Sequence, residues 1–237
     1  KNMAACMEQK QKELYHAHAQ RLALMLQNQT EEEFADSRFQ VLSELTRLRQ
    51  LCCDPALVYE NYEGGSAKLD LCIELIQSAV ESGHKILLFS QFTSMIEILT
   101  ARLQEESISC FVLQGSTKKE QRAQMVEQFN RDDTSVFCIS LKAGGTGLNL
   151  TGADIVIHYD PWWNVAVENQ ATDRAHRIGQ KNVVTVYKLI AKGTIEEKII
   201  KLQQMKKELA EEILSGDEIK TASFQREELL ELLEERF

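Results

Sequence analysis

The chain has 237 residues, of which 43% are hydrophobic, and its formal net charge is −9 at pH 7. This size suffices for one large domain or for a core domain with helical additions, and the 2 prolines and 11 glycines argue against disorder. The acidic balance argues against a broadly basic nucleic-acid coat, although residues 67–194 are close to neutral. No apolar run reaches membrane-spanning length and no signal peptide is evident, so we expect no membrane partner. Because the first residue is lysine, we expect a piece of a longer polypeptide.

The six cysteines do not suggest a disulfide or zinc framework. Cys52 and Cys53 are adjacent, the others are scattered among apolar residues, and there is no Cys-x-x-Cys pair. We therefore expect reduced, buried thiols of a cytosolic protein and no metal site. His16 and His18 lie near Cys6, but surface positions on a helix explain them better than a metal cluster.

Residues 1–53 predict helices. Residues 8–29 are rich in good helix formers, and from Glu31 the apolar side chains recur at helical spacing until Pro55 ends the run. Residues 60–66, ENYEGGS, contain two glycines and no apolar periodicity, so they predict a linker.

Five short β-type runs follow, several of them apolar throughout, at residues 85–90, 110–114, 135–141, 154–159 and 183–189. Apolar runs of this kind are typical of strands that are buried on both faces. Helical stretches separate most of the runs, and two of these stretches carry sequences typical of capping boxes, Ser94 with Glu97 and Thr117 with Glu120. The alternation predicts an α/β fold in which helices cover both faces of a parallel sheet.

Ligands of such sheets bind beyond the carboxyl ends of the strands. We therefore expect the chemistry just after four residues: Ser90, Gln114, Leu141 and Tyr159. After the last strand, residues 195–214 carry an apolar stripe at helical spacing, and residues 224–237 predict a second amphipathic helix.

The loop KAGGTGLNL, residues 142–150, follows the third run. Gly144, Gly145 and Gly147 would let a ligand approach the backbone closely and point N–H groups at it, which suits a phosphate. A tight strand-to-helix turn explains the same glycines equally well. The spacing does not fit a dinucleotide fingerprint, and the lack of any Gly-Lys dipeptide excludes a P-loop.

Two further loops lie at the same predicted edge. In QGSTKKEQR, a helix predicted to begin at Thr117 would leave Gly115, Ser116 and first-turn N–H groups to donate to a phosphate, although capping by Thr117 alone explains the pattern. In DPWWN, residues 160–164, one tryptophan beside Pro161 could stack on a base or sugar, and core packing of both rings is the alternative.

The segment QATDRAHRIGQ, residues 170–180, places Arg174 four residues after Gln170 and Arg177 three residues after that. On a helix this spacing points all three side chains the same way. A solvated helix face is the usual explanation, but here the arginines follow a predicted ligand edge. The guanidinium fork keeps its charge and donates two hydrogen bonds, so it suits phosphate.

Taken together, these motifs resemble the second RecA-like lobe of superfamily-two helicases, and most closely that of the Swi/Snf-type DNA-dependent ATPases. The motif order agrees: ILLFSQFT (86–93), LQGSTKKEQR (113–122), SLKAGGTGLNLTGA (140–153), DPWWN (160–164) and QATDRAHRIGQ (170–180). LTRLRQLCCDPAL (45–57) resembles the family's segment that leads into this lobe and GTIEEKII (193–200) the one that leaves it, so the resemblance covers essentially the whole chain. The resemblance implies a RecA-like parallel sheet with helices on both faces and added helices at both ends. It divides the chain into a helical protrusion and linker (1–66), the second RecA-like lobe (67–194) and C-terminal brace helices (195–237).

The same resemblance implies that ATP with magnesium binds between two lobes, and that the first lobe supplies the P-loop lysine and the acidic box. Neither occurs in this chain, so it would be half of an ATP hydrolase, and we expect it to be inactive alone. Arg174 and Arg177 would be arginine fingers, and Gln170 would line the same cleft. Gly147 and Asn149 would face the nucleotide.

The resemblance also implies contacts with double-stranded DNA. It assigns the phosphates of a tracking strand to Gly115, Ser116, Lys142, Gly144, Gly145 and Thr146, places Trp163 near the DNA, and makes Gln91 a further candidate. Nothing resembles base-edge readout, so binding should be sequence-independent. The expected partners are duplex DNA, the N-terminal lobe of the same polypeptide and a DNA-bound protein complex.

Three functions compete at this point: a lobe of a translocating, remodeller-type ATPase, a nucleic-acid-binding module without hydrolysis, and a strand-separating or RNA helicase. The intact Arg174 and Arg177 favour the first over the second. DRAHRIGQ and DPWWN argue against the third. The compact motif spacing favours a bacterial or otherwise minimal member, which would be nucleoid-associated in the cytoplasm; a eukaryotic member would be nuclear.

Overall fold

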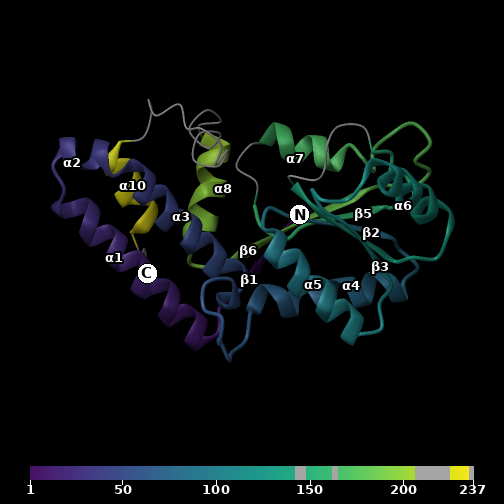
Figure 1. Ribbon diagram of the computed structural model, residues 1–237, viewed down its shortest axis with the longest axis horizontal. Coiled ribbons are helices and arrows are strands. Elements are labelled where there is room, and N and C mark those ends of the chain that lie inside the picture. The colour runs from purple at the N-terminus through teal and green to yellow at the C-terminus, as the bar shows by residue number, and fades with distance from the viewer. Residues whose placement is uncertain (142–147, 162–164, 206–224, 235–237) are drawn as a thin grey trace. The chain divides into compact units, whose positions relative to one another are not determined.

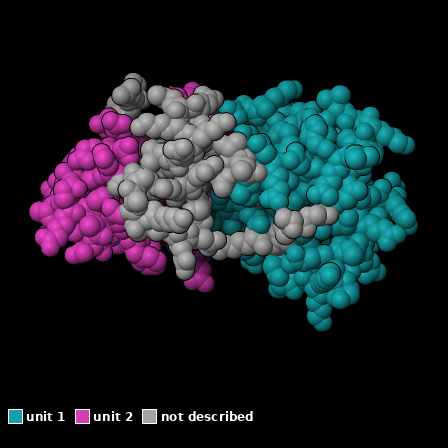
Figure 2. All heavy atoms as spheres, turned by 90° about the horizontal axis from the view of Figure 1, so that it is seen from above, with its two compact units in different colours: residues 1–3, 69–162, 166–189 teal, residues 4–68, 163–165, 190–237 magenta. Residues whose placement is uncertain are grey.

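The computed structural model describes residues 1–141, 148–161, 165–205 and 225–234 (Figure 1). The chain divides into two compact units, which Figure 2 colours separately. The sheet unit comprises residues 1–3, 69–162 and 166–189, and the helical unit comprises residues 4–68, 163–165 and 190–237.

Six strands form the sheet: β1 (Asn2–Ala5), β2 (Ile86–Ser90), β3 (Cys110–Leu113), β4 (Val136–Ser140), β5 (Ile155–His158) and β6 (Thr185–Ala191). Their order across the sheet is β1-β6-β5-β2-β4-β3. The four pairings among β2 to β6 are parallel, with β2 in the centre between β4 and β5. Every residue of β2, β4 and β5 is buried, which explains why these runs are apolar on both faces. The predicted parallel sheet and its five runs are confirmed.

The helices of the sheet unit are α4 (Ala67–Glu81), whose first two residues belong to the helical unit, α5 (Thr93–Glu105), α6 (Lys119–Arg131) and α7 (Val165–Thr172). Figure 1 shows α4 and α5 on one face of the sheet and α6 and α7 on the other. On the α6 side, Phe129 packs edge-to-face on Phe137 of β4, with ring centroids 5.3 Å apart. The sheet is therefore covered on both faces, as the alternating pattern predicts.

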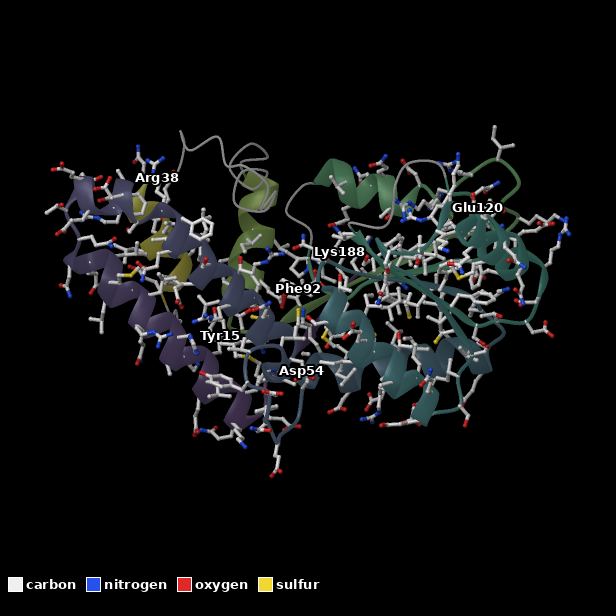
Figure 3. All side chains as sticks on the ribbon, in the orientation of Figure 1. Tyr15, Arg38, Asp54, Phe92, Glu120 and Lys188 are labelled. Carbon is white, nitrogen blue, oxygen red and sulfur yellow. The ribbon has the colours of Figure 1, made fainter. Side chains whose placement is uncertain are left out.

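The helical unit contains α1 (Gln9–Asn28), α2 (Glu31–Asp36), α3 (Arg38–Cys53), the 3-10 helix η1 (Pro55–Leu57), α8 (Ile195–Met205) and α10 (Arg226–Leu233). One hydrophobic core joins the N-terminal helices with α8 and α10. The Oη of Tyr15, labelled in Figure 3, accepts a 2.7 Å hydrogen bond from the Ile195 N–H, and Arg226 binds the carbonyl of Gln29. The two ends of the chain thus build a single core.

Three local predictions are wrong. Residues 2–5 form a strand rather than a helix, because they pair with β6, where the Lys192 N–H donates to the Ala5 carbonyl at 2.8 Å. Ser94 does not cap α5, since this helix already begins at Thr93. The Thr117 hydroxyl accepts the Gln114 N–H at 3.0 Å within a turn, so α6 begins at Lys119 without a side-chain cap.

All six cysteines lie in the described parts of the chain, and none forms a disulfide. Cys6 is exposed, so the expectation of buried thiols is wrong for this residue. His18 is buried rather than at the surface, because its ring packs between Tyr59 Oη at 2.6 Å and an Arg21 nitrogen at 2.9 Å. None of the described helices is long and apolar enough to cross a membrane.

Candidate functional site

The candidate site lies at the carboxyl edge of the sheet. Because β2, β3, β4 and β5 are parallel, the loops that follow them emerge at one edge. Four of the predicted site residues in these loops are described. Gln91 after β2 is half-buried, whereas Gly115 and Ser116 after β3 and Asn149 before β5 are exposed.

Asp160 ties the loop after β2 to the loop after β5. Its carboxylate accepts hydrogen bonds from the Ser90 hydroxyl and, at 3.1 Å, from the Gln91 N–H. The Ser90 hydroxyl in turn accepts the N–H of Phe92, labelled in Figure 3, at 3.2 Å. Asp160 and Ser90 are buried, so these charge-assisted bonds fix the backbone of Gln91. Sequence reasoning missed this role of Asp160, although the residue belongs to the DPWWN motif.

The loop after β3 is shaped by Arg122 of α6. Its guanidinium donates to the carbonyls of Thr117 at 2.9 Å, Gly115 at 3.2 Å and Gln114 at 3.3 Å. A Cβ added at Gly115 would meet nothing within 4 Å. Packing of the lobe therefore does not require glycine here, and the loop leaves open space beside an exposed backbone.

The loop before β5 is anchored by Asn130 of α6. The Asn130 side chain donates to the Asn149 carbonyl at 2.8 Å and accepts the Gly152 N–H at 2.9 Å. A Cβ at Gly152 would come within 3.0 Å of the Asn130 Cα, so this close approach does require glycine. The exposed Asn149 side chain thus projects from a fixed turn.

Arg174 and Arg177 do not lie on a helix, so the predicted common helical face of these arginines with Gln170 is wrong. Helix α7 ends at Thr172, and Arg174 lies in the turn that follows. The Arg174 carbonyl accepts the Leu150 N–H at 3.0 Å. Arg177 and Gln170 are exposed, whereas Arg174 is only 5% exposed.

The guanidinium of Arg174 lies over the ring of Phe89, with its carbon 5.6 Å from the ring centroid. Burial lowers the pKa of Arg174 to about 10, and the positive charge of Arg177 contributes to the same shift. With a pKa of about 10, the Arg174 guanidinium keeps its positive charge at neutral pH and can still pair with an anion.

Gln180 fixes the end of the arginine segment to the turn before β5. Its side-chain nitrogen donates to three carbonyl oxygens, those of Ala153 at 2.6 Å, Thr151 at 3.1 Å and Ala175 at 3.1 Å. Its side-chain oxygen accepts the Asn182 N–H at 2.9 Å. Sequence reasoning did not identify this role, although Gln180 is the last residue of DRAHRIGQ.

His158, the last residue of β5, is buried and neutral. Its ring stacks on Phe89 with centroids 5.6 Å apart, and its Nε2 lies 3.3 Å from the Thr172 hydroxyl. Burial, and then the positive charge of Lys188, lower the pKa of His158 to about 3. Lys188, labelled in Figure 3, is itself paired with Glu168 of α7.

We expect the free energy of unfolding to fall as the pH drops from the unfolded histidine pKa of 6.5 toward about 3. In that window the unfolded His158 takes up a proton that the folded state rejects, so stability is present above pH 6.5 and is lost on acidification. One such proton contributes a slope of at most about 1.4 kcal/mol per pH unit. Urea unfolding across this window measures the slope. His158→Gln should flatten it, whereas exposed His176→Gln should not; equal slopes for both variants would contradict the prediction.

Six of the predicted site residues lie outside the described residues: Lys142, Gly144, Gly145, Thr146, Gly147 and Trp163. Their roles stay predictions. Among the described residues, no group of three or more His, Cys, Asp or Glu side chains is placed to hold a metal ion.

Comparison with known proteins gives matches over the whole chain. The helicase conserved C-terminal domain model matches residues 67–179. The C-terminal domain of the Sulfolobus solfataricus SWI2/SNF2 ATPase is 32% identical with a TM-score of 0.79, and the match covers 100% of this chain and 98% of that one. The ATPase core of the same protein in complex with dsDNA is 32% identical with a TM-score of 0.81, and covers 100% and 50%.

An uncharacterized ATP-dependent helicase of Mycoplasma pneumoniae is 45% identical over 202 residues, which are 84% of this chain and 19% of that protein. The chain spans about a fifth of the length of this relative and of two further bacterial helicases that it matches, from Mycoplasma genitalium and Bacillus subtilis.

Proposed function

Because the chain belongs to the SWI2/SNF2 ATPase family, as its helicase C-terminal RecA-like lobe, we propose that it is the second motor lobe of an ATP-dependent double-stranded DNA translocase. The observation that carries the proposal is one sheet edge that gathers the Gln91, Gly115 and Asn149 loops with the arginine segment. A relative similar over the whole length of this chain was solved in complex with dsDNA, which supports DNA as the ligand of that edge.

In this proposal, Arg177 and Arg174 are arginine fingers that stabilise charge on the γ-phosphate of ATP during its transfer to water. ATP and its magnesium ion are held mainly by the N-terminal lobe, which supplies the P-loop lysine and the acidic residues. Gln170, Gly147 and Asn149 face the same nucleotide. Arg174 keeps its positive charge at neutral pH, which suits an anionic partner.

The DNA contacts in this proposal are backbone contacts. The open space beside Gly115 and the exposed Ser116 suit a phosphate oxygen that approaches the N–H groups before α6. Gln91 would extend this surface along the strand. The remaining contacts are Lys142, Gly144, Gly145, Thr146 and Trp163. None of them reads base edges, so binding is independent of sequence and weakens with salt.

Movement then follows from closure of the two lobes. ATP draws the lobes together, hydrolysis releases them, and each lobe holds the phosphate backbone in turn, so repeated closure moves the protein along the duplex. The arginine segment and the turn before β5 are joined by Gln180 and by the Leu150–Arg174 hydrogen bond. This connection holds two segments that face the nucleotide in this proposal, the Asn149 turn and the arginine segment, in one fixed arrangement.

The isolated chain should release no phosphate from ATP above background, even with saturating duplex DNA, because fingers alone cannot orient a triphosphate. The longer parent protein should hydrolyse ATP and do so faster with duplex DNA. Phosphate release from both proteins, at equal concentration and salt, checks this expectation. If the isolated chain hydrolysed ATP and Arg177→Ala abolished this turnover, the proposal that the chain is only half of an ATPase would be contradicted. A parent that binds duplex DNA without any turnover would instead indicate a non-enzymatic module.

A further inference from the structure

The segment after the arginines exposes two apolar side chains completely or nearly so. Ile178 is 102% exposed and Val183 is 90% exposed, whereas the next most exposed large apolar residue in the described chain, Phe39 of α3, is at 83%. Single exposed apolar residues are common on protein surfaces. Ile178 differs from such residues because it directly follows Arg177, which the proposed function aims at ATP in another lobe.

The turn that presents Ile178 is fixed rather than loose. Gly179 has a φ of +106°, a conformation that favours glycine, and the Gln180 N–H donates to the Arg177 carbonyl at 3.0 Å. The Gln180 side chain then anchors the turn to the carbonyls of Thr151 and Ala153. The fold therefore holds an isoleucine in solvent at a defined position, which is the arrangement of an apolar contact residue that is ready for a partner.

We propose that residues 177–183 dock on the other half of the ATPase core, the N-terminal lobe of the same polypeptide, and that Ile178 is the apolar anchor of this contact. The inference rests on the proposed function. This chain covers only 50% of the archaeal core, so the other half lies outside it. A guanidinium that reaches a nucleotide held there brings the adjacent isoleucine to the same surface.

The charges around Ile178 define the chemistry of the receiving surface. Arg177 and Lys181 are both exposed and flank the isoleucine on the two sides of the turn. An apolar centre with a cationic rim fits an apolar depression that is bordered by carboxylates. Docking removes Ile178 from water only when the lobes are closed, so the contact favours the closed state.

The test uses the parent protein with Ile178→Ser, and with Phe39→Ser as the matched exposed apolar control in the helical unit. Ile178→Ser should lower DNA-stimulated kcat about ten-fold, with duplex affinity and melting temperature unchanged. Ile178→Leu should restore turnover, because it restores the apolar contact. Phe39→Ser should behave as wild type in all three measurements.

Hydrogen exchange gives a readout that does not depend on turnover. A non-hydrolysable ATP analogue with duplex DNA should slow amide exchange in residues 177–183 of the wild type, and the slowing should be lost in Ile178→Ser. Unchanged kcat in Ile178→Ser, an equal loss in Phe39→Ser, or no protection of the segment would overturn the docking contact. A parent without any DNA-stimulated turnover would overturn the proposed function instead, and exchange would still test docking.

Discussion

Replacing Arg177 with alanine in the parent protein should lower DNA-stimulated ATP turnover by about a thousand-fold or more, with little change in melting temperature. The side chain is exposed, so its loss removes no core packing. What disappears is a guanidinium that stabilises the charge of the transferring phosphoryl group. Phosphate release at saturating duplex DNA, together with a thermal melt of the same preparation, measures both quantities.

Two companion variants separate charge from geometry and catalysis from folding. Arg177→Lys keeps the charge but loses the planar fork, so most of the turnover should still be lost. Arg174→Ala should lower both turnover and melting temperature, because this side chain is buried against the ring of Phe89. Unchanged turnover in Arg177→Ala would show that this arginine is a surface residue, and an equal loss of duplex binding would show that it holds DNA.

Replacing Lys68 with methionine should lower the free energy of unfolding by roughly 3–5 kcal/mol. The Lys68 Nζ lies 2.9 Å from both carboxylate oxygens of Glu196, and the two side chains are 1% and 2% exposed. Removing the lysine leaves a carboxylate charge in the core of the helical unit without its cation. Urea unfolding at constant pH measures the loss.

A double variant that also removes the charge of Glu196 provides the control for this loss of stability. Lys68→Met combined with Glu196→Gln should recover most of the stability, because no buried charge remains. In the wild type the Ala191 N–H donates to the Glu196 carboxylate at 2.9 Å, and the side-chain amide oxygen of the double variant can accept the same hydrogen bond. Arg131→Met, which breaks the exposed pair with Glu127 on α6, should cost at most about 0.5 kcal/mol. If Lys68→Met cost no more than Arg131→Met, burial of the pair would be irrelevant to its strength.

The sheet could be predicted from the sequence because its central strands are buried on both faces. The strands β2, β4 and β5 are apolar at every position except the last, which is Ser90, Ser140 or His158, and this pattern is available locally. Strand β1 could not be found in this way. Its pairing partner β6 lies about 180 residues away, and the Lys188 N–H of β6 donates to the Lys1 carbonyl at 2.9 Å. Tertiary pairing there overrides the local preference for helix.

In the candidate site, too, features that follow from local sequence could be predicted, and features that depend on contacts between distant segments could not. The loops at the carboxyl edge follow from strand order, so the positions of Gln91 and Gly115 were predictable. The roles of Asp160 and Gln180 were not, because each joins segments that are 20 or more residues apart in sequence. The end of α7 at Thr172 was also hidden, since the spacing of Arg174 and Arg177 is equally compatible with a helix and with a turn. The contacts of these residues with ATP and DNA are still predictions.

The single core shared by the two ends of the chain has a consequence for synthesis. Helix α1 ends at Asn28, and α10, which packs in the same core, begins at Arg226. A ribosome that adds about 5–20 residues per second leaves the apolar stripe of α1 without this cover for roughly 10–40 seconds. Strand β1 likewise has no pairing partner until β6 has been synthesised. The sheet unit can complete its central strands during that time, but the core of the helical unit is not complete before α10 emerges. Nascent chains that stop before residue 226 therefore lack the part of this core that α10 contributes.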